Sequence, residues 1–122
     1  MANLAVEEEI QVDQQRVKEI VAELGEMAAS NLIVAAMEQL SLALRQALRA
    51  AAQNDKAQIA AHADRLSKLA WQIGLVTLAG VAVDVGRCSE SGDMQALSAT
   101  LARLERVANR SLTEIWDSDL EP

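Results

Sequence analysis

Aromatic residues, proline and cysteine are nearly missing from this sequence of 122 residues. There is no Phe or Tyr, so a core has to be packed from aliphatic side chains and methionine. The one proline is Pro122, which leaves no helix breaker inside the chain. The single cysteine, Cys88, cannot form an internal disulfide, and this fits a reducing compartment.

Basic residues are also few, since 11 Lys and Arg stand against 18 Asp and Glu and the formal net charge is −7. We expect no nucleic acid and no membrane as partner, because both surfaces are anionic and attract basic faces. The N-terminal stretch lacks the regions of a signal peptide. The longest uncharged run, residues 69–83, is shorter than the roughly 20 apolar residues that span a bilayer. The expected location is cytoplasmic.

Strong helix formers dominate the composition instead. Apolar residues recur every three or four positions, which is the spacing of amphipathic helices. This pattern predicts helices over residues 6–24, 27–53, 55–73, 75–88 and 93–116. We therefore expect an all-α fold in a single domain, residues 1–122, built as an antiparallel four-helix bundle with an additional N-terminal helix.

Local signals predict where these helices begin and end. Asp55 and Asp93 are expected to be N-caps, Gly25 to stop the first helix, and residues 89–92 to form a loop. Glu7, Glu8 and Glu9 are expected in the first turn of the first helix, near the positive end of the helix dipole.

The first and fourth segments need a further comment. Ile10 is expected on the buried stripe of the first helix. The fourth segment, residues 75–88, is rich in β-branched side chains and also fits a buried strand. We expect a helix there, because a lone strand would have no partner among helical neighbours.

The sequence offers little for catalysis or metal binding. His62 is the one histidine, whereas a di-iron bundle needs two Glu-x-x-His pairs. No local motif links Cys88 to a base, so a partly buried thiol near a helix end is expected rather than a nucleophile. Glycine-rich phosphate loops are absent. No metal and no cofactor are expected.

The segment 55–73 carries the most informative pattern. At about 100° per residue, its apolar residues form one core-facing arc, and His62 lies about 40° from the centre of that arc. Asp64, Lys68 and Trp71 fall nearly opposite. An exposed Trp is a common interface anchor, although Trp71 could instead fold onto a neighbouring helix. We define the outer face by seven residues: Ala57, Ala60, Ala61, Asp64, Ser67, Lys68 and Trp71.

This segment resembles the signature helix of the histidine-containing phosphotransfer (HPt) domain, roughly H-x-L-K-G-x-A-x-x-I-G after a Gly-Asp or Asn-Asp turn. The motif's Leu, Ala, Ile and Gly positions are matched by Leu66, Ala70, Ile73 and Gly74. Asp55 matches the preceding turn, and Gly92-Asp93 resembles the turn before the family's last helix. The layout of a lead helix and four bundle helices extends the resemblance over nearly the whole chain.

The departures from the motif fall on its reactive positions. Asp64 stands at the phosphoacceptor position, Ser67 at the Lys position, and Lys68 at the small Gly that admits a partner. His62 comes two residues early, about 200° away around the helix. The resemblance thus implies a phosphorelay protein that docks a receiver domain or a histidine kinase without a phosphoacceptor of its own.

Two alternatives stay open. In the first, the protein is an active histidine phosphotransfer protein with His62 as phosphoacceptor, which requires a different rotation of the helix. In the second, it is a structural helical bundle that interacts with other proteins, for example as a homodimer. All three readings favour an adaptor or a phosphotransfer intermediate over a catalyst.

Overall fold

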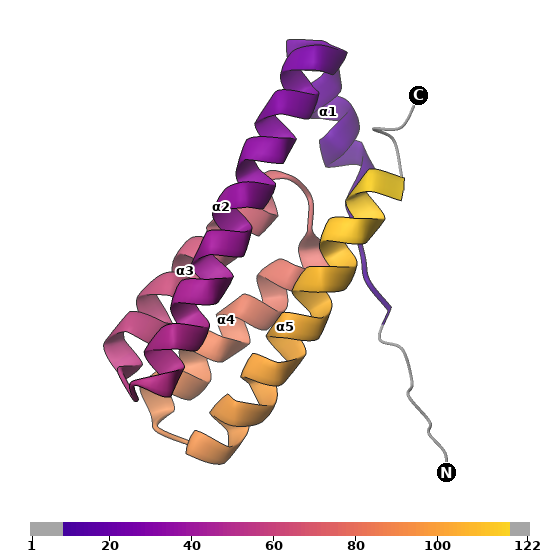
Figure 1. Ribbon diagram of the computed structural model, residues 1–122. Helices are drawn as coiled ribbons and strands as arrows, with labels where there is room; N and C mark the ends of the chain where they lie inside the picture. The colour runs from indigo at the N-terminus through magenta and orange to yellow at the C-terminus, as the bar shows by residue number, and fades with distance from the viewer. Residues whose placement is uncertain (1–8, 118–122) are drawn as a thin grey trace.

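The computed structural model describes residues 9–117, and these residues are almost entirely helical (Figure 1). The helices are α1 (Gln14–Leu24), α2 (Glu26–Ala52), α3 (Lys56–Gln72), α4 (Val76–Ser91) and α5 (Met94–Asp117). The one β feature in this part of the chain is an isolated bridge between Val12 and Leu75. The predicted all-α class is confirmed, and the β-branched fourth segment is a helix rather than a strand.

The helices pack in an order that follows the chain. α3 lies between α2 and α4, α5 packs against α4, and α2 and α5 meet only slightly. α1 folds back along the first part of α2 (Figure 1). Together these two helices form a hairpin that projects beyond the turn between α3 and α4 (Figure 1).

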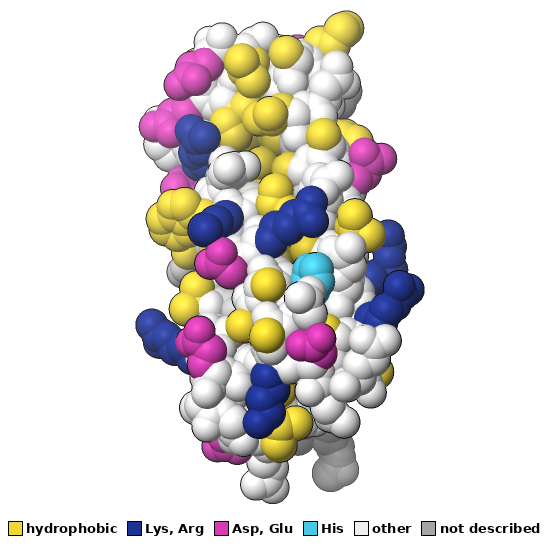
Figure 2. All heavy atoms as spheres, turned by 90° about the vertical axis from the view of Figure 1, so that its left-hand side faces the viewer, with side chains coloured by type: hydrophobic (Ala, Val, Ile, Leu, Met, Phe, Trp, Pro, Cys, Tyr) yellow, Lys and Arg dark blue, Asp and Glu magenta, His cyan; other side chains and the backbone are white. Residues whose placement is uncertain are grey.

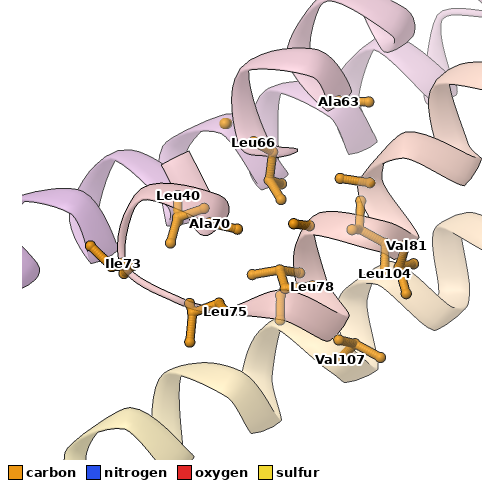
Figure 3. Close-up of a cluster of buried hydrophobic side chains, with 14 of the residues drawn as sticks. Leu40, Ala63, Leu66, Ala70, Ile73, Leu75, Leu78, Val81, Leu104 and Val107 are labelled. Carbon is orange, nitrogen blue, oxygen red and sulfur yellow. The ribbon is translucent and has the colours of Figure 1, made fainter. Parts of the chain in front are cut away.

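Aliphatic side chains fill the space between the helices. Leu66 of α3, Leu78 of α4 and Val107 of α5 point into one cluster (Figure 3). Ile59 and Leu66 of α3, and Ile73 directly after it, are all fully buried, as the sequence predicts. Each such side chain stabilises the fold by roughly 1.5–3 kcal/mol on burial, so this stripe fixes the rotation of α3 about its own axis.

The first helix is shorter than predicted. It begins at Gln14 instead of residue 6, and Glu9 and Ile10 precede it in non-helical backbone. The placement of Glu9 in a first helical turn is therefore wrong. Ile10 is not on a helical stripe either, although it still packs against the core. Residues 6–8 of the predicted helix lie outside the described residues.

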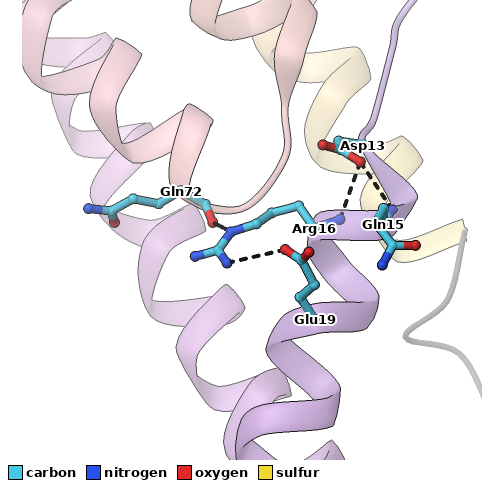
Figure 4. Close-up of polar contacts among 5 residues, drawn as sticks. All are labelled: Asp13, Gln15, Arg16, Glu19 and Gln72. Atoms are coloured by element: carbon cyan, nitrogen blue, oxygen red, sulfur yellow. Dashed lines mark hydrogen bonds and ion pairs between the residues drawn. The ribbon is translucent and has the colours of Figure 1, made fainter.

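Asp13 is the reason for the late start of α1. Its carboxylate accepts hydrogen bonds from the backbone N–H groups of Gln15 and Arg16, at 3.1 and 3.2 Å (Figure 4). Its own N–H donates to the carbonyl oxygen of Gly74 at 2.7 Å, beside the Val12–Leu75 bridge. Backbone tied in this extended pairing cannot also join a helix. We call residues 12–13 and 74–75 the junction.

Helix α4 is longer than predicted. Residues 89–91, expected in a loop, continue the helix, which ends at Gly92 in the left-handed conformation with φ 77°. Ser89 is buried, and its hydroxyl donates to the carbonyl oxygen of Lys56 at 2.8 Å. This contact across the fold satisfies the serine, and a Gly in left-handed backbone is a common helix end.

The predicted caps are present. The Asp55 carboxylate accepts from the N–H of Gln58 at 3.1 Å, and the Asp93 carboxylate accepts from the N–H of Ala96 at 3.0 Å. Gly25 ends α1 with φ 85°, so it serves as the predicted stop.

Helix α2 is long and apolar enough to cross a membrane by length and composition, with a mean hydropathy of 1.4 in its most apolar window. Among the described residues this helix, and not the uncharged run at residues 69–83, meets the criteria for a candidate span. In this fold 33% of that α2 window is buried inside the protein. One such helix is a weak indication, since core helices of soluble proteins and signal sequences meet the same criteria.

Candidate protein interface

Helix α3 places His62 at the side of the outer face rather than on it. His62 is half-buried. Three residues later on the same side of the helix, the guanidinium of Arg65 donates to the side-chain oxygen of Gln39 on α2. His62 thus lies toward α2, on the flank that the helical spacing predicts.

Asp64, at the phosphoacceptor-equivalent position, is exposed and ion-paired. Its carboxylate lies 2.9 Å from the ammonium of Lys68, one helical turn away. Both side chains remain largely in solvent, with exposed fractions of 64% and 73%. An ion pair this exposed adds little to stability, because solvent screens it. Its charges are accordingly available to a partner.

Trp71 is an exposed aromatic side chain, with 64% of its surface in solvent. It does not fold onto a neighbouring helix. Together with Asp13, Arg16 and Gln72 it lines a shallow hollow of about 270 Å³. An exposed indole beside a hollow is the kind of side chain that anchors protein interfaces.

Arg16 builds the wall of this hollow. Its Nε donates to the carbonyl oxygen of Gln72 at 2.9 Å, and its guanidinium lies 3.7 Å from the Glu19 carboxylate (Figure 4). The hydrogen bond satisfies a carbonyl at the end of α3 and joins that end to α1. The surroundings of Trp71 are thereby held by the Arg16 side chain, next to the junction.

A groove of about 190 Å³ runs between α3 and α4. It is lined by Ala60, Asp64, Ser67, Ala82, Val83, Gly86, Arg87 and Glu90. Three outer-face residues, Ala60, Asp64 and Ser67, lie in this groove. This groove owes its shape to small residues such as Gly86, where an added Cβ would meet nothing within 4 Å.

A second groove, of about 460 Å³, lies on the other side of α4 toward α5. Val83 and Arg87 line both grooves and so form a ridge between them. In the second groove, Asp84 faces Arg103 of α5 at 3.9 Å. This contribution of α4 could not be predicted from its sequence, because the charged residues of α4 show only that one face meets water, and not which neighbour flanks that face.

The remaining outer-face residues complete the surface. Ala57 and Ala61 are exposed, whereas Ala60 and Ser67 are half-buried against α4. Seen from the side of α2 and α3, hydrophobic side chains alternate with acidic and basic ones, and the histidine lies among them (Figure 2). Apolar patches broken by charges are typical of surfaces that bind other proteins reversibly.

Catalytic groups do not gather around this surface. Among residues 9–117, no three His, Cys, Asp or Glu side chains are placed to hold a metal ion. Cys88 is half-buried on α4, as predicted, and its Sγ lies 3.6 Å from the hydroxyl of Thr100 on α5. That hydroxyl is itself bonded to the Ala96 carbonyl and is no base for a thiol.

Comparisons of the chain with protein-family models, with curated proteins and with solved structures find no match. The features of this chain that point to a function are therefore the motif in α3 and the surface that α3 and α4 form together.

Proposed function

We propose that this protein is an HPt-like phosphorelay protein that docks a receiver domain or a histidine kinase and has no phosphoacceptor of its own. In this proposal α2 to α5 form the antiparallel four-helix bundle, and α1 is the additional N-terminal helix. The protein acts in the cytoplasm, where those partners expose their phosphotransfer surfaces, and it needs no cofactor.

The observation that carries the proposal is the position of His62 relative to Asp64. In-line transfer requires an exposed imidazole that reaches the aspartyl phosphate of a receiver. His62 is half-buried toward α2, whereas Asp64 occupies the exposed position. Rotating α3 to present His62 would expose Ile59 and Leu66, at a cost of roughly 1.5–3 kcal/mol for each side chain.

Asp64 does not replace a phosphoacceptor histidine in this proposal. Phosphorylated aspartates work beside a Mg²⁺ ion held by an acidic cluster, and Asp64 is instead paired with Lys68. Its carboxylate offers a partner a fixed negative charge, although with fewer acceptor oxygens than a phosphoryl group. The adjoining groove and Trp71 supply apolar contact area.

Docking and phosphotransfer can be tested together. Purified protein is titrated against a panel of receiver domains and kinase dimerisation domains, and each receiver is then supplied phosphorylated with labelled phosphate. We expect at least one partner to bind and no acid-labile label to appear on the protein.

Two results would decide against this proposal. Acid-labile label that disappears in His62→Gln would establish the active phosphotransfer alternative. Binding to none of the receivers and kinases would favour the purely structural bundle, and light scattering would then show whether it is a homodimer.

A further inference from the structure

The hairpin of α1 and α2 ends in an apolar surface that the core does not use. We call Leu24, Met27, Ala28, Leu32 and Ala35 the tip. Leu24, Met27 and Leu32 are 48%, 80% and 46% exposed, and Ala28 and Ala35 are exposed as well. Hydrophobic side chains gather at this upper end of the molecule in the space-filling view (Figure 2).

Three residues of the tip form a continuous stripe on α2, and Leu24 and Met27 flank the turn before it. On α2, Ala28, Leu32 and Ala35 follow one another at spacings of four and three, so they form a stripe. The core-facing side of the same stretch is a different stripe, Ala29 and Ile33, which is fully buried. The first part of α2 therefore has two apolar stripes. One of them is covered inside the fold, and the other remains in solvent.

Exposed large hydrophobic side chains are concentrated here. Six are found among the described residues, and three of them, Leu24, Met27 and Leu32, fall in residues 24–32. Single exposed apolar residues are ordinary, but a cluster of them marks an interaction surface. Met27 has a flexible, polarisable side chain that adapts to different partners.

Carboxylates surround the tip and narrow the choice of partner. Glu23 and Glu26 are exposed on either side of the turn at Gly25, and Glu38 is exposed further along α2. The basic residue closest to the tip in the sequence is Lys18. A second copy of the chain would bring the same carboxylates together, and an anionic lipid surface would be repelled in the same way.

From the exposed stripe and its acidic rim, we propose that the tip docks a basic amphipathic helix of another protein. The apolar face of such a helix lies on the stripe of Ala28, Leu32 and Ala35, where the two alanines let it approach closely, and Met27 contacts it from the side of that stripe. Its Lys and Arg side chains reach the rim carboxylates, which steer association. This surface is separate from the outer face of α3, so the proposal stands independently of the phosphorelay function.

Fluorescence anisotropy with a labelled amphipathic helical peptide of leucine and lysine tests the proposal, with a scrambled peptide of the same composition as reference. We expect Met27→Gln/Leu32→Gln to weaken binding about tenfold, a typical loss for central interface side chains. Met94→Gln is the matched control, because Met94 is also exposed, at 47%, but begins α5. Glu23→Gln/Glu26→Gln should reduce the salt dependence of binding.

Several outcomes overturn the proposal. Equal affinity for both peptides, or an affinity unchanged in Met27→Gln/Leu32→Gln, would remove the tip as the binding surface. A dimer seen by light scattering that Met27→Gln dissociates would assign the tip to a second copy. Flotation with vesicles of anionic lipid that the same variant abolishes would assign it to a membrane. Circular dichroism on each variant verifies that it is folded.

Discussion

The two faces of α3 differ in what they determine. The inner face, with Ile59, Leu66 and Ile73, is fully buried and is packed against α2 and α4. The outer face, with Lys68 and Trp71 among its residues, lies mostly in solvent. The motif positions that match the HPt pattern are inner ones and the turn after them, whereas the departures are on the outer face. A match on the inner face informs about the fold, and only the outer face informs about chemistry.

The energies of the two faces explain why they can vary separately. Each buried aliphatic side chain of the inner face contributes roughly 1.5–3 kcal/mol. The exposed Asp64–Lys68 pair contributes at most about 1 kcal/mol, since solvent screens it. The reactive position of such a helix can therefore change while the fold is kept. Substitutions on the inner face of α3 should therefore change the stability strongly, and substitutions on its outer face only slightly.

The largest effect is expected at Leu66. Leu66 has no exposed surface, so Leu66→Ala leaves a cavity in the cluster that α3, α4 and α5 share (Figure 3). We expect a loss of about 3 kcal/mol in the free energy of unfolding, measured by urea denaturation. A loss below about 1 kcal/mol would mean that α3 is rotated differently, and the distinction between its faces would fail.

The next effect concerns the junction that holds the end of α3. Gly74 has φ 81°, and a Cβ there would approach the carbonyl oxygen of Asp13 to 2.8 Å. Gly74→Ala should lower the free energy of unfolding by at least about 2 kcal/mol, from backbone strain and this contact.

Gly80 provides the matched control for this substitution. It lies within α4, and an added Cβ would meet nothing within 4 Å. Gly80→Ala should therefore stabilise the protein by about 0.5–1 kcal/mol, because alanine favours the helix. Equal destabilisation by both substitutions would show that the junction does not constrain Gly74.

Local signals in the sequence were enough to predict much of the fold. Asp55 and Asp93 cap the helices that follow them, because capping depends on residues three apart. The rotation of α3 follows from its own periodicity. The start of α1 and the length of α4 could not be predicted, since they depend on hydrogen bonds from Asp13 to Gly74 and from Ser89 to Lys56 across the fold.

The candidate interface also has features that could be predicted from the sequence and features that could not. The exposure of Asp64 follows from its place on one helix and is confirmed. For Trp71 the sequence left two positions open, and the structure leaves the side chain exposed. The contribution of Gly86 and Arg87 depends on which face of α4 lies beside α3, and no pattern within α4 specifies its neighbour. Periodicity assigns a residue to the inside or the outside, but only packing assigns it to a groove.

The smallest stability effects are expected on the outer face, where the effects on binding should be largest. Trp71→Ala and Lys68→Glu should each change the free energy of unfolding by less than about 1 kcal/mol. Each should weaken docking of a bound receiver or kinase domain, the first by removing an anchor and the second by reversing a charge. Thermal denaturation and titration calorimetry measure the two quantities. Unfolding by either substitution would show that the face is part of the core.

Exchanging the charges of Asp64 and Lys68 distinguishes the effect of the ion pair on docking from the effect of a carboxylate at position 64. Asp64→Lys/Lys68→Asp keeps an oppositely charged pair one helical turn apart, so stability should stay within about 0.5 kcal/mol of the original. The negative charge, however, leaves the phosphoacceptor-equivalent position. If docking depends on a carboxylate at that position, the exchanged protein binds as poorly as Lys68→Glu. If binding returns to its original strength, the pair acts as a local contact, and the likeness of Asp64 to a phosphorylated histidine has no part in recognition.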